Sequence, residues 1–171
     1  MLCVDEALKI WLKIINKITN IPSNLIINGE SIRGSELVYV KNGQRIPLTN
    51  KDNYIVFYLD YIDDISVVDT EDSLLTTQSY ELHLIVYGDN CKVLSHKIKS
   101  NIYSEGILYI LRDNNIGLQE IPSIENTSNF MNENTYQFRN DIRIRFNCVI
   151  ESDKIISINE IDDILLKGRD L

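Results

Sequence analysis

Residues 78–103 constrain the fold more than any other stretch, because two hydrophobic periods meet there. From residue 80 to residue 87 the side chains alternate with a period of two, as in a strand, and one face holds Tyr80, Leu82, Leu84 and Val86. Gly88 then permits a turn, and Asp89 or Asn90 can cap a helix through a side-chain oxygen. Helical spacing follows at Cys91, Leu94, Ile98 and Ile102. The stretch therefore predicts a strand, a tight turn and a helix that folds back on the strand.

A second alternating run spans residues 138–150 and predicts a long half-buried strand. Its apolar face holds Phe138, Ile142, Ile144, Phe146, Cys148 and Ile150. Its polar face holds Arg139, Asp141, Arg143, Arg145 and Asn147. We expect this strand to pair with the strand of residues 79–87, with the apolar faces of both covered by helices.

The remaining segments complete an α+β fold with a mostly antiparallel sheet and helices packed on one face. Helices are predicted over residues 5–20, where Pro22 ends the helix, and over residues 107–112. Strands are predicted over residues 25–27, 36–40, 54–61 and 116–121. Residues 123–136 are polar and predict a loop, and residues 155–166 predict a strand or a short helix. We expect one domain over residues 1–171, in which residues 23–52 form an extended arm or a long loop.

Charge, hydropathy and cysteine content exclude several classes of function. The chain has 171 residues and a net charge of -8, so its surface repels phosphate and specific nucleic-acid binding is not expected. No apolar run is long enough to cross a membrane. The three cysteines, Cys3, Cys91 and Cys148, are far apart and predict reduced, buried thiols.

No set of residues assembles a nucleophile, a base and an orienting group, so we expect neither an enzyme nor a cofactor or metal site. His83 and His96 belong to no zinc-binding pattern. The acidic stretch with Asp63, Asp64, Asp69, Glu71 and Asp72 predicts a solvated loop. A metal-dependent nuclease that uses Asp60, Asp63 and Asp64 is the enzyme alternative.

The polar faces of the two alternating strands are the candidate functional surface. Three arginines interleave with Asp141 on one strand, and Glu81 and His83 lie on the other. Nearby acids oppose nucleic-acid binding, so the pattern favours cross-strand ion pairs or a subunit interface. The candidate interface residues are Glu81, His83, Arg139, Arg143 and Arg145.

Five stretches of the chain together form the pattern of a known family: Gln78-Ser79-Tyr80-Glu81, Val86-Tyr87-Gly88-Asp89-Asn90, Ile116-Gly117-Leu118, the region of Pro122, and Tyr136-Gln137-Phe138-Arg139. In these stretches the chain resembles the neck or tail terminator proteins of long-tailed bacteriophages. The resemblance covers residues 76–151 and weakens over residues 1–53, where only Pro22 and Pro47 remain of a proline-bearing segment.

The resemblance implies a structural role and no catalytic residue. Such proteins form a ring, usually a hexamer, that caps the head-proximal end of the tail tube and stops its polymerisation. The implied partners are other copies of the chain, the tail tube protein, and sheath and neck or head-completion proteins, with DNA only passing through. The implied place is the tail or neck of a virion, or of a phage-tail-like bacteriocin, assembled in the bacterial cytoplasm. The alternative is a monomeric or dimeric head- or tail-completion adaptor that binds one protein partner.

Overall fold

The computed structural model describes residues 4–29, 38–41, 44–49, 52–69, 73–120, 124–132 and 135–153. Its elements, in chain order, are α1 (Val4–Thr19), the 3₁₀ turn η1 (Ser23–Leu25), β1 (Ile26–Asn28), β2 (Val38–Lys41), β3 (Gln44–Pro47), β4 (Tyr54–Asp69), β5 (Ser73–Tyr87), α2 (Cys91–Asn101), α3 (Glu105–Asp113), β6 (Ile116–Glu120), β7 (Glu125–Asn126), β8 (Asn129–Asn132), β9 (Thr135–Gln137) and β10 (Arg139–Asp153).

The main sheet has the strand order β1-β4-β5-β10-β6, and β7 also pairs with β10. Only the short β1–β4 pair is parallel, and the other pairs are antiparallel. The predicted pairing of the two long strands is confirmed, because β10 pairs with β5 from Arg139↔Tyr87 to Asp153↔Ser73. Two small hairpins, β2–β3 and β8–β9, stand apart from this sheet. The fold is therefore α+β with a mostly antiparallel sheet, as predicted.

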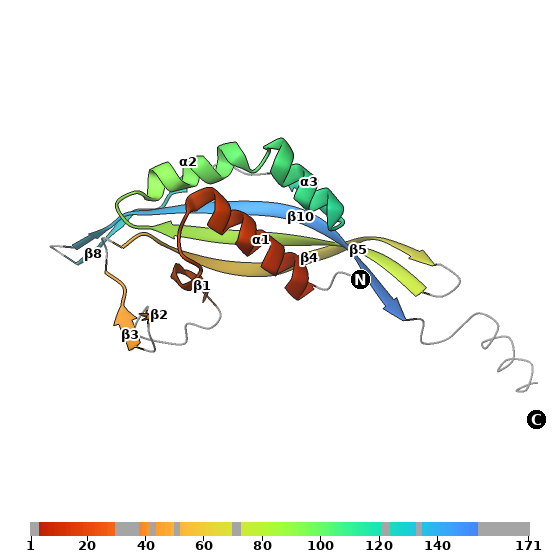
Figure 1. Cartoon of the computed structure of the whole chain (residues 1–171), viewed down its shortest axis with the longest axis horizontal. Helices are drawn as coiled ribbons and strands as arrows, with labels where there is room; N and C mark the ends of the chain where they lie inside the picture. Colours follow the sequence, from red (N-terminus) through yellow and green to blue (C-terminus); the bar gives the residue numbers. More distant parts are fainter. Residues whose placement is uncertain are drawn as a thin grey trace, which may run out of the picture.

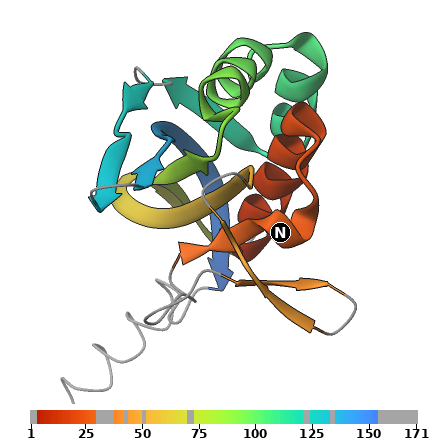
Figure 2. The ribbon, with the colours of Figure 1, turned by 90° about the vertical axis from the view of Figure 1, so that its left-hand side faces the viewer.

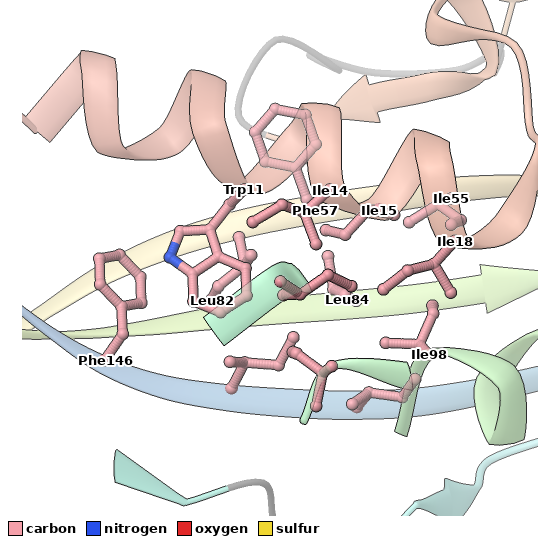
Figure 3. Packing of buried hydrophobic residues seen from close by; sticks show 14 of the residues in the cluster. Trp11, Ile14, Ile15, Ile18, Ile55, Phe57, Leu82, Leu84, Ile98 and Phe146 are labelled. Carbon is pink, nitrogen blue, oxygen red and sulfur yellow. The ribbon is translucent and has the colours of Figure 1, made fainter. Parts of the chain in front are cut away.

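The three helices lie along one face of the sheet (Figures 1 and 2). The predicted stripe of α1 packs against the sheet, and Trp11 and Ile15 are fully buried there. Figure 3 shows Trp11 beside Phe146 of β10, and their ring centroids are 5.4 Å apart. Burial of these side chains supplies the main stabilising free energy of the fold.

The core also contains two of the predicted thiols. Cys91 and Cys148 are free and buried, and burial raises the pKa of both thiols. Cys3 lies outside the described residues. In the part of the chain that the structure describes, no helix is long and apolar enough to span a membrane.

The turn between β5 and α2 differs from the prediction in its capping. Gly88 has a φ of +101°, which glycine adopts readily. Asn90 occupies the N-cap position, but its side chain makes no capping hydrogen bond. Its backbone N–H instead donates to Oδ1 of Asn53, at 3.0 Å. The chain before β4 therefore holds this turn in place.

The first helix ends earlier than Pro22. Helix α1 stops at Thr19, and Asn20 adopts the left-handed conformation, with a φ of +59°. Asparagine tolerates this conformation and commonly terminates helices. Pro22 follows two residues later and begins the approach to η1.

Two loop predictions are wrong. Asp63, Asp64 and Asp69 lie in β4, which continues to Asp69, so this stretch is not a solvated loop; residues 71–72 lie outside the described residues. Residues 125–126, 129–132 and 135–137 form β7, β8 and β9, where a loop was predicted. In both segments, strand pairing overrides a polar sequence pattern.

The outer strand β4 contains two bulges. Its register with β5 shifts between Tyr61 and Asp63 and again between Asp64 and Ser66. Ile62 and Ile65 are therefore extra residues without a partner across the ladder. These bulges fall where β4 and β5 extend beyond the helices, toward the right-hand end of Figure 1.

One predicted residue position is wrong, and one predicted strand is only partly confirmed. Phe138 was predicted on the apolar face, but it is 45% exposed and precedes β10. The predicted strand of residues 36–40 is partly confirmed by β2, and residues 36–37 and 155–166 lie outside the described residues.

Candidate subunit interface

All five candidate interface residues lie on the sheet face that points away from the helices, which we call the open face. Glu81 and His83 come from β5, and the three arginines come from β10. The register pairs Arg145 with Glu81, and Arg143 with His83. Residues paired across a ladder share a face, so antiparallel pairing brings these side chains together.

Glu81 holds two arginines. Its Oε2 accepts a hydrogen bond from Nε of Arg145 at 2.9 Å, and its Oε1 lies 3.9 Å from Nε of Arg143. The side chain of Glu81 is 14% exposed, whereas those of Arg143 and Arg145 are 52% and 55% exposed. One carboxylate therefore serves two guanidinium groups, and this cluster keeps a net positive charge.

A second cluster centres on Asp141. Arg139 donates to both oxygens of this carboxylate, at 3.0 Å from Nε and 2.9 Å from Nη2, and Thr127 donates its hydroxyl at 2.8 Å. Burial tends to raise the pKa of Asp141, but these bonds and the Arg139 charge outweigh it, so the pKa is lowered. The same contact raises the pKa of Arg139.

Sequence reasoning placed Asp141 on this face but did not identify it as the centre of a cluster. The alternation of β10 sets Arg139 and Asp141 two residues apart on one face, which was a usable signal. Thr127 comes from the segment predicted to be a loop, so no pattern pointed to it.

Two polar atoms on the open face are buried without a hydrogen-bond partner among the described residues. They are Nε2 of His83 and Oδ1 of Asn147. Nε2 of His83 lies 3.6 Å from the Asp141 carboxylate, which is too long for a hydrogen bond. Such atoms each cost about 1–3 kcal/mol, so the face is incompletely satisfied within one copy of this part of the chain.

A small apolar cluster covers one end of the open face. It contains Tyr54, Val56, Ile85 and Tyr87, and the rings of Tyr54 and Tyr87 stack with centroids 4.6 Å apart. Burial raises the pKa of both tyrosines. Glu81, Arg143 and Arg145 lie between this cluster and the far end of the strands, in the middle of the open face, whereas Arg139 lies beside Tyr87 of the cluster.

The acidic residues of β4 form no metal site in the described structure. Asp60 pairs with Glu81 and Asp63 with Ser79, so both lie on the open face, while Asp64 pairs with Gln78 on the other. No group of three or more His, Cys, Asp or Glu side chains that could hold a metal ion occurs among the described residues.

Comparisons with known proteins identify the family of this chain. A comparison with curated proteins finds no match. A family model described as phage neck terminator protein matches residues 13–169. The match covers most of the chain, including both long strands and all of the candidate interface residues. The chain therefore belongs to the phage neck terminator family, which places it among the structural proteins of the phage neck.

Proposed function

We propose that copies of this chain assemble into a ring, of six subunits, on the head-proximal end of a tail tube. The ring stops polymerisation of the tube and joins the tail to the neck and head proteins. It assembles in the bacterial cytoplasm and becomes part of the virion. Membership of the neck terminator family supports this role.

The observation that carries the proposal is the arginine pair, Arg143 and Arg145. Both side chains are more than half exposed and share the single carboxylate of Glu81. An exposed cationic surface on a chain of net charge -8 is suited to an acidic protein partner. We therefore propose that Glu81, His83, Arg139, Arg143 and Arg145 form a contact surface of the assembled particle.

Overall charge supports the ring in a second way. An acidic subunit presents negative charge to a central channel, and negative charge repels the DNA backbone. DNA could then pass through the ring without binding to its wall.

The test combines negative-stain imaging with native mass measurement of the purified protein, alone and after addition of tail tubes from the same particle. We expect rings with a central hole, or caps on one end of the tubes. A monodisperse monomer or dimer that leaves the tubes bare would contradict the ring and favour the adaptor instead.

A further inference from the structure

The end of the β4–β5 hairpin carries an unusual density of exposed apolar side chains. We call this part, Asp60–Val68 of β4 with Ser73–Ser79 of β5, the arm; it extends beyond the helices (Figure 1). Five of the ten exposed large apolar side chains in the described part of the chain lie on it: Tyr61, Ile62, Ile65, Val67 and Val68. Clustered exposure of this kind marks a protein contact rather than a free surface.

The outer edge of the arm is also open. Strand β1 pairs with β4 only over Ile55–Phe57, and no described strand pairs with the outer edge of β4 beyond that point. Free edges recruit other strands unless charges or bulges block them, and β4 has both. The carboxylates of Asp60, Asp63 and Asp64 form no ion pair within the described residues.

Charge changes sign across the open face. One row of the sheet runs from Asp60 on β4 through Glu81 on β5 to Arg145 on β10. The β4 side is acidic, and the β10 side carries the arginine pair. Glu120 of β6 pairs with Arg145 in the backbone register and offsets part of that charge, but no ion pair joins them in the described structure.

We propose that the arm of one copy packs against the arginine pair of the next copy, so that subunits join head to tail. This inference rests on the proposed ring and names the contact that builds it. The carboxylates of Asp60 and Asp63, which both lie on the open face, would meet Arg143 and Arg145. Val149, which is 37% exposed and follows the arginines on the same face of β10, offers an apolar partner for the arm.

The charge pattern distinguishes this arrangement from a two-fold dimer. A two-fold contact through the arms would bring acidic edges together, and like charges across an interface weaken it. A head-to-tail contact joins two different surfaces, acidic against basic, and closes into a ring when its rotation allows. The asymmetry within one subunit therefore disfavours a two-fold contact of arm against arm, and the native mass separates a head-to-tail ring from a dimer with two reciprocal contacts between arm and arginine pair.

Charge exchange tests the contact. In the arm variant, Asp60→Lys/Asp63→Lys, two cationic surfaces face each other, and in the arginine variant, Arg143→Glu/Arg145→Glu, two anionic surfaces do. We expect each variant to raise the concentration needed for ring formation by about tenfold or more, on the full-length protein with and without tail tubes. An equimolar mixture should restore rings, because every contact in an alternating ring then joins opposite charges. Only rings with an even number of copies can alternate in this way, so the mass of the restored ring is a further check.

Matched controls change the same charge elsewhere. Lys92→Glu/Lys99→Glu lies on α2, and Glu105→Lys/Asp113→Lys lies on exposed positions of α3, both on the opposite side of the sheet. Both should leave ring formation unchanged. Restoration by mixing also shows that the two interface variants are folded, and the neutral substitutions Arg143→Gln/Arg145→Gln provide a milder variant that should weaken ring formation less.

The outcomes separate this inference from the proposed function. Rings that persist in both charge-reversal variants would overturn the contact but leave the terminator role intact. If rings persist in the arm variant but no longer cap tubes, the arm contacts the tail tube and not the next subunit, and the proposed contact is overturned. Wild-type protein that forms no ring, either alone or on tubes, would overturn both.

Discussion

Replacing Gly88 by alanine should destabilise the protein by about 3–7 kcal/mol, from three effects seen in the structure. The φ of +101° is disfavoured for alanine by about 1–3 kcal/mol. A Cβ atom would lie 2.4 Å from the backbone oxygen of Asp52, about 1 Å closer than ordinary contact. Moving that segment costs about 1–3 kcal/mol, and losing the bond from Asn90 to Asn53 costs about 1 kcal/mol.

The assay is thermal unfolding followed by circular dichroism. At about 2.1 cal/mol/K for each of 171 residues, the unfolding entropy is about 0.36 kcal/mol/K, so the expected loss corresponds to a fall in Tm of about 8–19 °C.

Gly106→Ala is the matched control, because a Cβ atom there meets no atom within 4 Å and the residue lies in the exposed part of α3. This control should raise stability by about 0.5–1 kcal/mol through better helix propensity. A Tm for Gly88→Ala within 2 °C of the wild type, on the order of experimental scatter, would refute the reasoning.

Two further predictions concern the core and the open face. Trp11→Ala should cost about 3–5 kcal/mol in urea unfolding, because the side chain is fully buried against Phe146; equal stability of variant and wild type would contradict the packing described. The lowered pKa of Asp141 contributes stability that is present above the unfolded value of 3.8 and is lost as the pH falls through the folded value. Asp141→Asn should therefore lower the free energy of unfolding at pH 7 and make that free energy less dependent on pH below about pH 4. Acid unfolding that is the same in variant and wild type would argue against the cluster.

The sequence was most informative where one period ran without interruption. The alternation in β10, and in the part of β5 from Tyr80 onward, predicted these two long strands and their pairing. The same alternation placed Glu81 and Arg145 on one face, and the register of the ladder then brought them into contact. Strict alternation leaves little freedom, because a shift of one residue would expose the core face.

Prediction was correct for the strand of residues 54–61 but failed in the rest of β4, for a physical reason. The bulges at Ile62 and Ile65 interrupt the alternation, and the adjacent carboxylates give the segment the composition of a loop. Strands β7, β8 and β9 were missed because they are two to four residues long and made largely of polar residues. Such short strands depend on their partners, and a local pattern does not reveal those partners.

The paired bulges in β4 also affect how the arm can change in evolution. One bulge reverses the facing of every residue beyond it, and the second reverses it again, so Val67 returns to the side it would occupy in a regular strand. Each partner on β5 fixes the face of the residue opposite it, so deletion of Ile62 or Ile65 alone would remove one bulge, with its bend and added twist, while every other residue of β4 kept its partner and its face. A single codon could thus change the direction in which the arm points, and related particles could diverge in partner choice without rebuilding the domain.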